Sequence, residues 1–190
     1  MATDTRDRLI RAAHDLFYQE GFHAVGLDRL LAEVGVTKTT FYNHFGSKDE
    51  LILAALQWHD DWWRTSFLEM VRRLGGERPI DQLRAIPDAL DELFSGPDYN
   101  GCMFVNVAVD FPLAHDPAHQ AAAAHKQAML GAIRQLAAYA GAPDPAALAE
   151  ELALVMEGAY VTVQVSDNDG TTDVARRLVD AILARHIPGA

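Results

Sequence analysis

Apolar residues recur at helical spacing along the whole chain, and this periodicity constrains the fold more than any other feature of the sequence. The segment 27–34 shows it clearly, since its leucines and its last valine fall at positions i, i+3, i+4 and i+7 on one helical face. No stretch has the alternation of apolar and polar residues that a half-buried strand requires. The sequence therefore predicts an all-α fold of about nine helices.

Glycine and proline residues divide this pattern into separate helices. Gly21 ends the first helix, and Gly35 is placed to cap the second in the left-handed conformation. The run 47–50 has the sequence of a capping box, so a long fourth helix begins there. We expect a three-helix head, residues 1–46, that continues through the fourth helix into a larger helical body, residues 47–190. The expected helices cover about 5–20, 27–34, 37–45, 47–74, 80–94, 101–111, 117–139, 146–165 and, after a break at 170–172, 173–186.

The composition limits where such a chain can work. Its 190 residues are 49% apolar, which is enough for a substantial core, yet no run of 18 apolar residues could span a membrane. The first residues lack the apolar stretch of a secretory signal, and the single cysteine, Cys102, excludes an internal disulfide. These features favour a cytoplasmic protein with no membrane partner. Cys102 itself has two interpretations, a redox sensor and an inert buried thiol.

The net charge of −11 is unevenly distributed along the chain. Residues 1–48 contain six basic and six acidic side chains, so all of the excess acid lies in the remaining residues. An acidic surface repels the phosphates of nucleic acids, whereas a balanced one does not. The distribution therefore permits DNA binding by the N-terminal segment and disfavours it elsewhere.

The two short helices on either side of Gly35 have the pattern of a helix-turn-helix, from Leu27 to Phe45. In such a unit the first helix braces the DNA backbone and the second lies in the major groove. The outward residues of the second helix carry donors and acceptors long enough to reach phosphates and base edges. They are Lys38, Thr39, Tyr42 and Asn43. The alternative interpretation is a solvated face on an ordinary packing helix.

This head closely resembles that of TetR-family transcriptional regulators. The resemblance lies in three segments, AEVGVTK at 32–38, TTFYNHF at 39–45 and SKDEL at 47–51. It implies a DNA-binding domain in which a defined set of residues contacts phosphates or bases. The set is Arg29, Thr37, Lys38, Thr39, Thr40, Tyr42, Asn43, His44 and Lys48. His14 and His23 are interpreted as surface histidines without a role.

The chain also departs from the family pattern at three positions. Val25 and Gly26 stand where the family often has Thr or Ser before the second helix, so a hydroxyl contact to phosphate is lost. Thr39 stands where the family often has glycine. The operator sequence therefore cannot be transferred from relatives.

The same resemblance implies a homodimer that binds a near-palindromic, double-stranded operator. Family members pair through their last two helices, and both of these helices carry broad apolar bands in this sequence. A two-fold dimer would place its recognition helices about 34–36 Å apart, one turn of B-DNA. The alternative is that the bands belong to the core of one chain. The residues expected at the dimer interface are Leu152, Val155, Met156, Tyr160, Leu178 and Ile182.

The middle helices carry aromatic and methionine side chains, which form adaptable apolar walls. The resemblance implies that they enclose a pocket for a small apolar or amphipathic effector, with no cofactor. Asn106 and Asp110 lie at i, i+4 and would either orient the ligand or tie down a helix end. For the apolar residues the alternative is an ordinary core. The expected ligand-binding residues are Trp58, Trp62, Phe67, Met103, Phe104, Asn106, Asp110 and Met129.

Two other function classes fit parts of the sequence. A helical metal-dependent enzyme would use His115, Asp116, His119 and His125, but their spacing is not the i, i+4 pair that a helical metal site favours. No phosphate loop, nucleophile elbow or pair of catalytic carboxylates is recognisable in the sequence. A protein-interaction module that does not bind DNA is the other class. The resemblance favours a transcriptional repressor that is released by its ligand and is not an enzyme.

Overall fold

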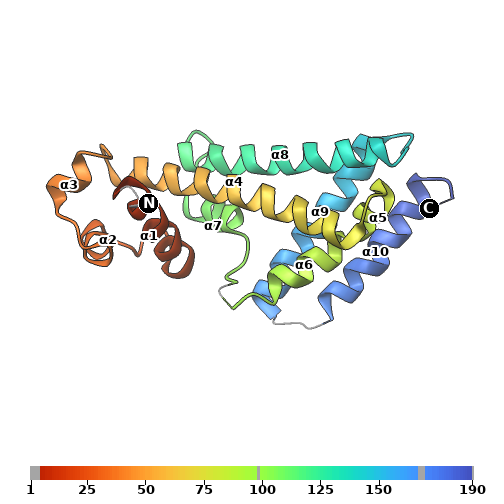
Figure 1. Ribbon diagram of the computed structural model, residues 1–190, viewed down its shortest axis with the longest axis horizontal. Helices are drawn as coiled ribbons and strands as arrows, with labels where there is room; N and C mark the ends of the chain where they lie inside the picture. The colour runs from red at the N-terminus through yellow and green to blue at the C-terminus, as the bar shows by residue number, and fades with distance from the viewer. Residues whose placement is uncertain (1–4, 98, 167–169, 190) are drawn as a thin grey trace. The chain divides into compact units, whose positions relative to one another are not determined.

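The computed structural model describes residues 5–97, 99–166 and 170–189, and this part of the chain contains helices and no strand (Figure 1). The predicted all-α fold is confirmed. The helices are α1 (Thr5–Glu20), α2 (Leu27–Val34), α3 (Lys38–Tyr42), α4 (Lys48–Gly75), α5 (Pro79–Arg84), α6 (Ile86–Phe94), α7 (Met103–Asp110), α8 (Pro117–Tyr139), α9 (Pro145–Ser166) and α10 (Thr171–His186). None of the described helices is both long and apolar enough to cross a membrane.

Two predicted helices differ from the structure by more than two residues at a boundary or in their continuity. The one expected over 80–94 is divided at Ala85 into α5 and α6, because Pro87 has no N–H to continue the hydrogen bonding of α5. The one expected over 37–45 is classed as helical only to Tyr42. Helical hydrogen bonding nevertheless continues, since the N–H of Phe45 donates to the carbonyl oxygen of Phe41 at 3.0 Å.

The described chain forms two compact units. One contains the residues up to Trp63 together with Met103–His125, and the other contains Arg64–Cys102 and the residues from Lys126 onward. Helices α4 and α8 each contribute to both units. The expected functional division between a head of residues 1–46 and a body of residues 47–190 stays a prediction.

The helix ends in the head are fixed by the residues that the sequence indicates. Gly35 has a φ of 73° and ends α2 in the left-handed conformation, with its N–H donating to the carbonyl oxygen of Leu31. Thr37 caps α3 by accepting the N–H of Thr40. The Ser47 hydroxyl accepts the N–H of Glu50, whose carboxylate accepts the N–H of Gly46. The turn and the starts of α3 and α4 therefore follow from local sequence.

The core of the head consists of large apolar side chains that are almost completely buried. Phe17 stacks on Phe22 with ring centroids 5.3 Å apart, and Phe41 stacks on Phe45 at 5.8 Å. Burying a side chain of this size contributes about 1.5–3 kcal/mol relative to leaving it exposed. The buried set includes Leu9, Ala13, Phe17, Phe22, Leu30, Phe41 and Phe45.

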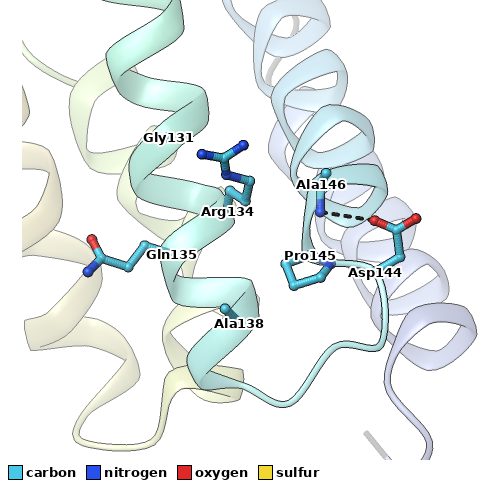
Figure 2. Close-up of a pocket in the computed structure, with 7 residues that line it drawn as sticks. All are labelled: Gly131, Arg134, Gln135, Ala138, Asp144, Pro145 and Ala146. Carbon is cyan, nitrogen blue, oxygen red and sulfur yellow. Dashed lines mark hydrogen bonds between the residues drawn. The ribbon is translucent and has the colours of Figure 1, made fainter.

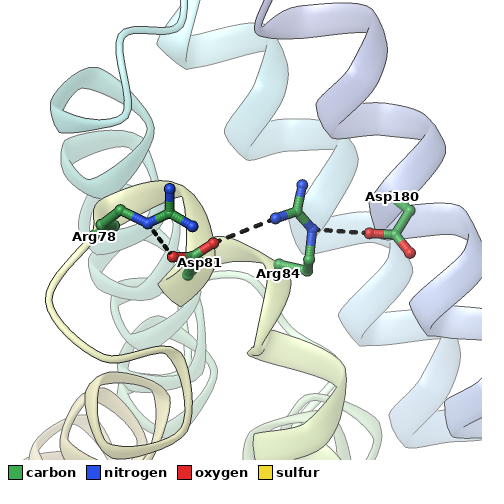
Figure 3. A network of polar contacts seen from close by, with 4 residues as sticks. All are labelled: Arg78, Asp81, Arg84 and Asp180. Atoms are coloured by element: carbon green, nitrogen blue, oxygen red, sulfur yellow. Dashed lines mark hydrogen bonds and ion pairs between the residues drawn. The ribbon is translucent and has the colours of Figure 1, made fainter. Parts of the chain in front are cut away.

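In the second unit, α10 packs against α9, α6 and α5. Figure 3 shows the polar contacts on one side of this packing, where the Arg84 guanidinium lies between Asp81 of α5 and Asp180 of α10. Arg176 of α10 donates to Asp88 of α6 at 2.6 Å. Exposed ion pairs contribute at most about 1 kcal/mol each, so they orient α10 while buried leucines and valines stabilise its packing.

Candidate nucleic-acid interface

The short helix α3 has one buried face and one polar face. Phe41 is fully buried beneath it, whereas Lys38, Thr39 and Asn43 are exposed and the Tyr42 side chain is 57% exposed. Thr40 and His44 are half-buried beside this face. The exposed side chains offer an ammonium, two hydroxyls and an amide, which are groups that bind phosphates and base edges.

The exposed cations of the predicted interface are ion-paired within the head. The Lys38 ammonium lies 2.8 Å from Asp28, and this hydrogen bond raises the pKa of Lys38. Arg29 donates to Glu33 at 2.7 Å and to Glu20 at 3.3 Å, and the bond to Glu33 is the main cause of its raised pKa. Pairs as exposed as these are weak, so a phosphate can replace either carboxylate.

Lys48 has an internal partner that the sequence does not indicate. Its ammonium donates to the carbonyl oxygen of Phe22 at 2.6 Å and lies 5.5 Å from the ring centroid of Phe17. Burial lowers its pKa, and the neighbouring Asp49 raises it to a smaller degree. Lys48 therefore holds the end of α1 to the start of α4, and its predicted contact with DNA stays a prediction.

The turn between α1 and α2 is also held by α7. The Phe22 N–H donates to the Asp110 carboxylate at 3.2 Å, and the His23 ring donates to the Asp110 carbonyl oxygen at 2.9 Å. Phe111 packs its ring against both Phe22 and His23. Asp110 ties the end of α7 to the head, as in the alternative left open by the sequence, and its expected contact with a ligand stays a prediction. His23 is exposed, as expected, but the expectation that it has no role is wrong, because it binds the end of α7.

A second junction in the same unit is built around buried histidines. His14 of α1 and His59 of α4 share a hydrogen bond of 2.8 Å, and His125 of α8 donates to Asp60 at 2.6 Å. Phe104 of α7 stacks on His125 with ring centroids 3.8 Å apart. Burial, followed by the neighbouring His14 and His125, lowers the pKa of His59 to about 3. His14 therefore has a structural role, contrary to its interpretation as a surface histidine.

The sequence indicates only part of this histidine cluster, which is formed by His14, His59 and His125. Trp58, Trp62 and Phe104, expected to bind a ligand, lie within it, since their rings contact His14 or His59. His59 has no sequence neighbour that marks it, because its partner lies 45 residues away.

The burial of the remaining residues expected to bind a ligand does not distinguish a ligand site from an ordinary core. Phe67, Met103 and Met129 are buried as an ordinary core would have them, and Asn106 is half-buried. A pocket of about 480 Å³ lies elsewhere, between α8 and the start of α9 (Figure 2). There Asp144 already caps α9 by accepting the N–H groups of Ala146 and Ala147. None of the expected ligand residues lines it.

The histidines of the metal-enzyme alternative do not converge in the structure. Asp116 caps α8 by accepting the Ala118 N–H at 2.8 Å, while the His119 ring donates to the carbonyl oxygen of Phe111. His125 is engaged by Asp60. Within the described residues there is no group of three or more His, Cys, Asp or Glu side chains placed to hold a metal ion.

The apolar surface of α9 and α10 differs from the expected dimer interface. Leu152, Met156, Tyr160 and Ile182 are buried within the chain itself, so they belong to its core, and Val155 is half-buried. Helical periodicity shows that a residue is on an apolar face but not which partner covers that face. The Leu178 side chain is 47% exposed. The other large apolar residues exposed on these helices are Leu154, Val161, Val165 and Val174.

Comparison with known proteins extends the resemblance to TetR-family regulators along most of the chain. The family model described as "Bacterial regulatory proteins, tetR family" matches residues 9–55. The model described as "Tetracyclin repressor-like, C-terminal domain" matches residues 79–179. The crystal structure of SCO4454, a TetR-family transcriptional regulator from Streptomyces coelicolor, is similar with a TM-score of 0.87 and 32% identity, covering 96% of this chain and 95% of that one.

Two curated relatives match over shorter segments. The HTH-type transcriptional activator FasR of Mycolicibacterium smegmatis is 45% identical over 58 residues, which are 30% of this chain and 26% of the relative. The HTH-type transcriptional repressor NemR of Escherichia coli is 27% identical over 107 residues, 56% of this chain and 54% of the relative. The chain thus spans about a quarter and about half of these two proteins.

The low pKa of His59 predicts a specific loss of stability in mild acid. The unfolded chain binds a proton at His59 below pH 6.5, whereas the folded chain does not until about pH 3. The free energy of unfolding should therefore fall as the pH falls through this range, by about 2 kcal/mol from this residue between pH 7.5 and 5. Urea unfolding of His59→Gln should show a shallower pH dependence than the wild type. His115→Gln, at an exposed histidine, should keep the wild-type dependence; parallel curves for all three proteins would contradict the prediction.

Proposed function

The chain belongs to the tetR family of bacterial regulatory proteins, and from this premise we propose that it is a homodimeric repressor released from its operator by a small molecule. It is a DNA-binding transcriptional regulator. The observation that carries the proposal is the polar face of α3, which is exposed opposite the buried Phe41 on a helix-turn-helix whose turn is capped by Gly35 and Thr37. Because it would bind operator DNA, we propose that it acts in the cytoplasm.

The roles proposed for the head residues follow from their exposure. Thr39, Tyr42 and Asn43 face outward from α3 and reach into the major groove. Lys38 and Arg29 exchange their surface carboxylates for phosphates when DNA arrives. Thr40 and His44 are half-buried and Thr37 caps α3, so these three residues position the backbone. Lys48 contributes through the ammonium protons that Phe22 leaves unused.

Repression requires less of the protein than activation does. A repressor need only occupy its operator, whereas an activator also needs a surface for the transcription machinery. The relatives carry names of both kinds, since NemR is a repressor and FasR an activator. We therefore propose repression, which requires only that the head occupies the operator. The excess acid of the chain lies outside the head and does not oppose this.

The dimer is proposed to form through the exposed apolar residues of α9 and α10. On the other side of α10, Arg176 and the Arg84–Asp180 pair hold the helix to α6 and α5 within the same chain. Exposed apolar side chains that gather on adjacent helices mark an interaction surface. The proposed dimer residues are Leu154, Val161, Val165, Val174 and Leu178.

The contact of Asp110 with the head offers a route for ligand release. A ligand that displaces α7 would pull on the turn at Phe22 and His23, and through it on the position of α2 and α3. Coupling between two sites is typically about 1–3 kcal/mol, which corresponds to a 5- to 150-fold change in DNA affinity. The effector proposed is a small apolar or amphipathic molecule.

Replacing Tyr42 tests the DNA-binding face. Tyr42→Ala should weaken binding to duplex fragments selected from genomic DNA by about tenfold or more, because a hydrogen bond to a charged phosphate contributes roughly 1.5–3 kcal/mol. Fluorescence anisotropy would measure the affinity. Tyr139→Ala removes an equally exposed tyrosine from α8 and should leave the affinity unchanged. Equal affinities for the two variants would remove Tyr42 from the interface.

Replacing Leu178 tests the dimer surface. Leu178→Asp should shift sedimentation from dimer to monomer, because a carboxylate at the centre of an apolar interface is buried without a partner. Leu113→Asp changes a leucine that is also exposed, but lies after α7, and should remain dimeric. A Leu178→Asp protein that sediments as a dimer would show that the surface of α9 and α10 has another use.

Replacing Asp110 tests the route of release. A compound that raises the melting temperature in a screen of apolar and amphipathic molecules should weaken DNA binding of the wild type. In Asp110→Ala the compound should still bind, but the ratio of DNA affinities with and without it should approach one. Asp116→Ala removes a capping aspartate of α8 and should keep the wild-type ratio. Full release in Asp110→Ala would exclude this contact as the route.

A further inference from the structure

Most cations of the head have a polar partner inside the head. Arg8 donates to the carbonyl oxygen of Val34 at 2.6 Å, where it satisfies a free carbonyl at the end of α2. Lys48 donates to Phe22, and Lys38 and Arg29 are paired with carboxylates. These contacts satisfy or neutralise the positive charges before any DNA is present.

Arg6 and Arg11 differ from the other cations of the head. Both are exposed on α1, and no carboxylate in the described part of the chain lies within ion-pair distance of either guanidinium. Each guanidinium lies over an aromatic ring instead, Arg6 over Phe45 at 5.1 Å from the centroid and Arg11 over Trp58 at 5.8 Å. A ring orients a cation without cancelling its charge.

The ring beneath Arg6 belongs to the DNA-binding unit. Phe45 ends the helix-turn-helix and stacks on Phe41, and Phe41 in turn contacts the exposed Tyr42 edge to face at 5.2 Å. The aromatic series from Phe45 to Tyr42 therefore places the Arg6 guanidinium beside the end of α3 that carries Tyr42 and Asn43. Trp58, under Arg11, belongs to α4 and to the histidine cluster.

We propose that Arg6 is a DNA-binding residue that binds a backbone phosphate at the edge of the half-site contacted by α3. The proposal rests on the proposed DNA-binding function and adds a contact from α1. The N–H donors of a guanidinium held over a ring remain available to the oxygens of a phosphodiester, which they match in geometry. Because no carboxylate of the described residues must be displaced, Arg6 binds phosphate without the exchange that Lys38 and Arg29 require.

Arg11 provides a matched control for this assignment. It is also an arginine of α1, it is also exposed, and its guanidinium also lies over an aromatic ring. It lies five residues along α1, roughly 7.5 Å farther along the axis and on a different face. An effect of net charge alone would be the same for both arginines, whereas a phosphate contact would appear only at Arg6.

The test is the salt dependence of binding to a duplex fragment that the wild-type protein selects from genomic DNA. Each neutralised phosphate contributes about 0.9 to the slope of log affinity against log salt concentration. Arg6→Gln should reduce the slope by about that amount, so its deficit relative to the wild type narrows roughly threefold between 50 and 200 mM salt. Arg6→Lys should retain most of the slope. Arg11→Gln should match the wild type.

Three results would overturn the assignment. Arg6→Gln with the wild-type slope and the wild-type melting temperature would show that Arg6 contacts no phosphate. Equal losses of slope for Arg6→Gln and Arg11→Gln would show an effect of net charge. If the wild type selects no fragment, the proposed function fails and Arg6 with it. If Arg6→Gln lowers the melting temperature, Arg6→Lys decides the question, because it keeps a positive charge over the ring. It must then restore both the melting temperature and the salt slope.

Discussion

The polar surface proposed to bind DNA depends on the burial of Phe41 and Phe45. Helix α3 is only five residues long, and a helix this short does not form in isolation because its nucleation cost exceeds the gain from its few hydrogen bonds. Its stability comes from the two rings that it buries against the head, which also fix its rotation about its own axis. Lys38, Thr39, Tyr42 and Asn43 face outward because Phe41 faces inward.

The turn at Phe22 connects this head to the rest of its compact unit. Its carbonyl oxygen accepts from Lys48 of α4, its N–H donates to Asp110 of α7, and its ring packs between Phe17 and Phe111. One residue therefore receives contacts from three helices. A displacement of α7 would therefore act on the head through hydrogen bonds as well as through the continuous chain at the start of α4.

The sequence predicts the head well because its determinants are local. The caps at Gly35, Thr37 and Ser47 depend on residues within three or four positions, and so does the inward direction of Phe41. The junctions are not predictable in this way, because Phe22 and Asp110 are 88 residues apart and His14 and His59 are 45 apart. The outward face of α9 and α10 is not predictable for a related reason. Leu152 and Leu154 are both apolar residues of α9, and only the fold shows that the first is buried and the second exposed.

The charges of the head also limit how it can recognise DNA. Residues 1–48 have as many acidic as basic side chains, and Lys38 and Arg29 lie beside carboxylates, so the unbound head gains little from the long-range attraction that draws strongly basic proteins to any DNA. The acidic remainder of the chain opposes nonspecific binding further. Affinity must then come from short-range contacts that form only when the outward residues of α3 fit their site. A nearly neutral head on an acidic protein therefore favours discrimination between sequences over tight binding to all of them.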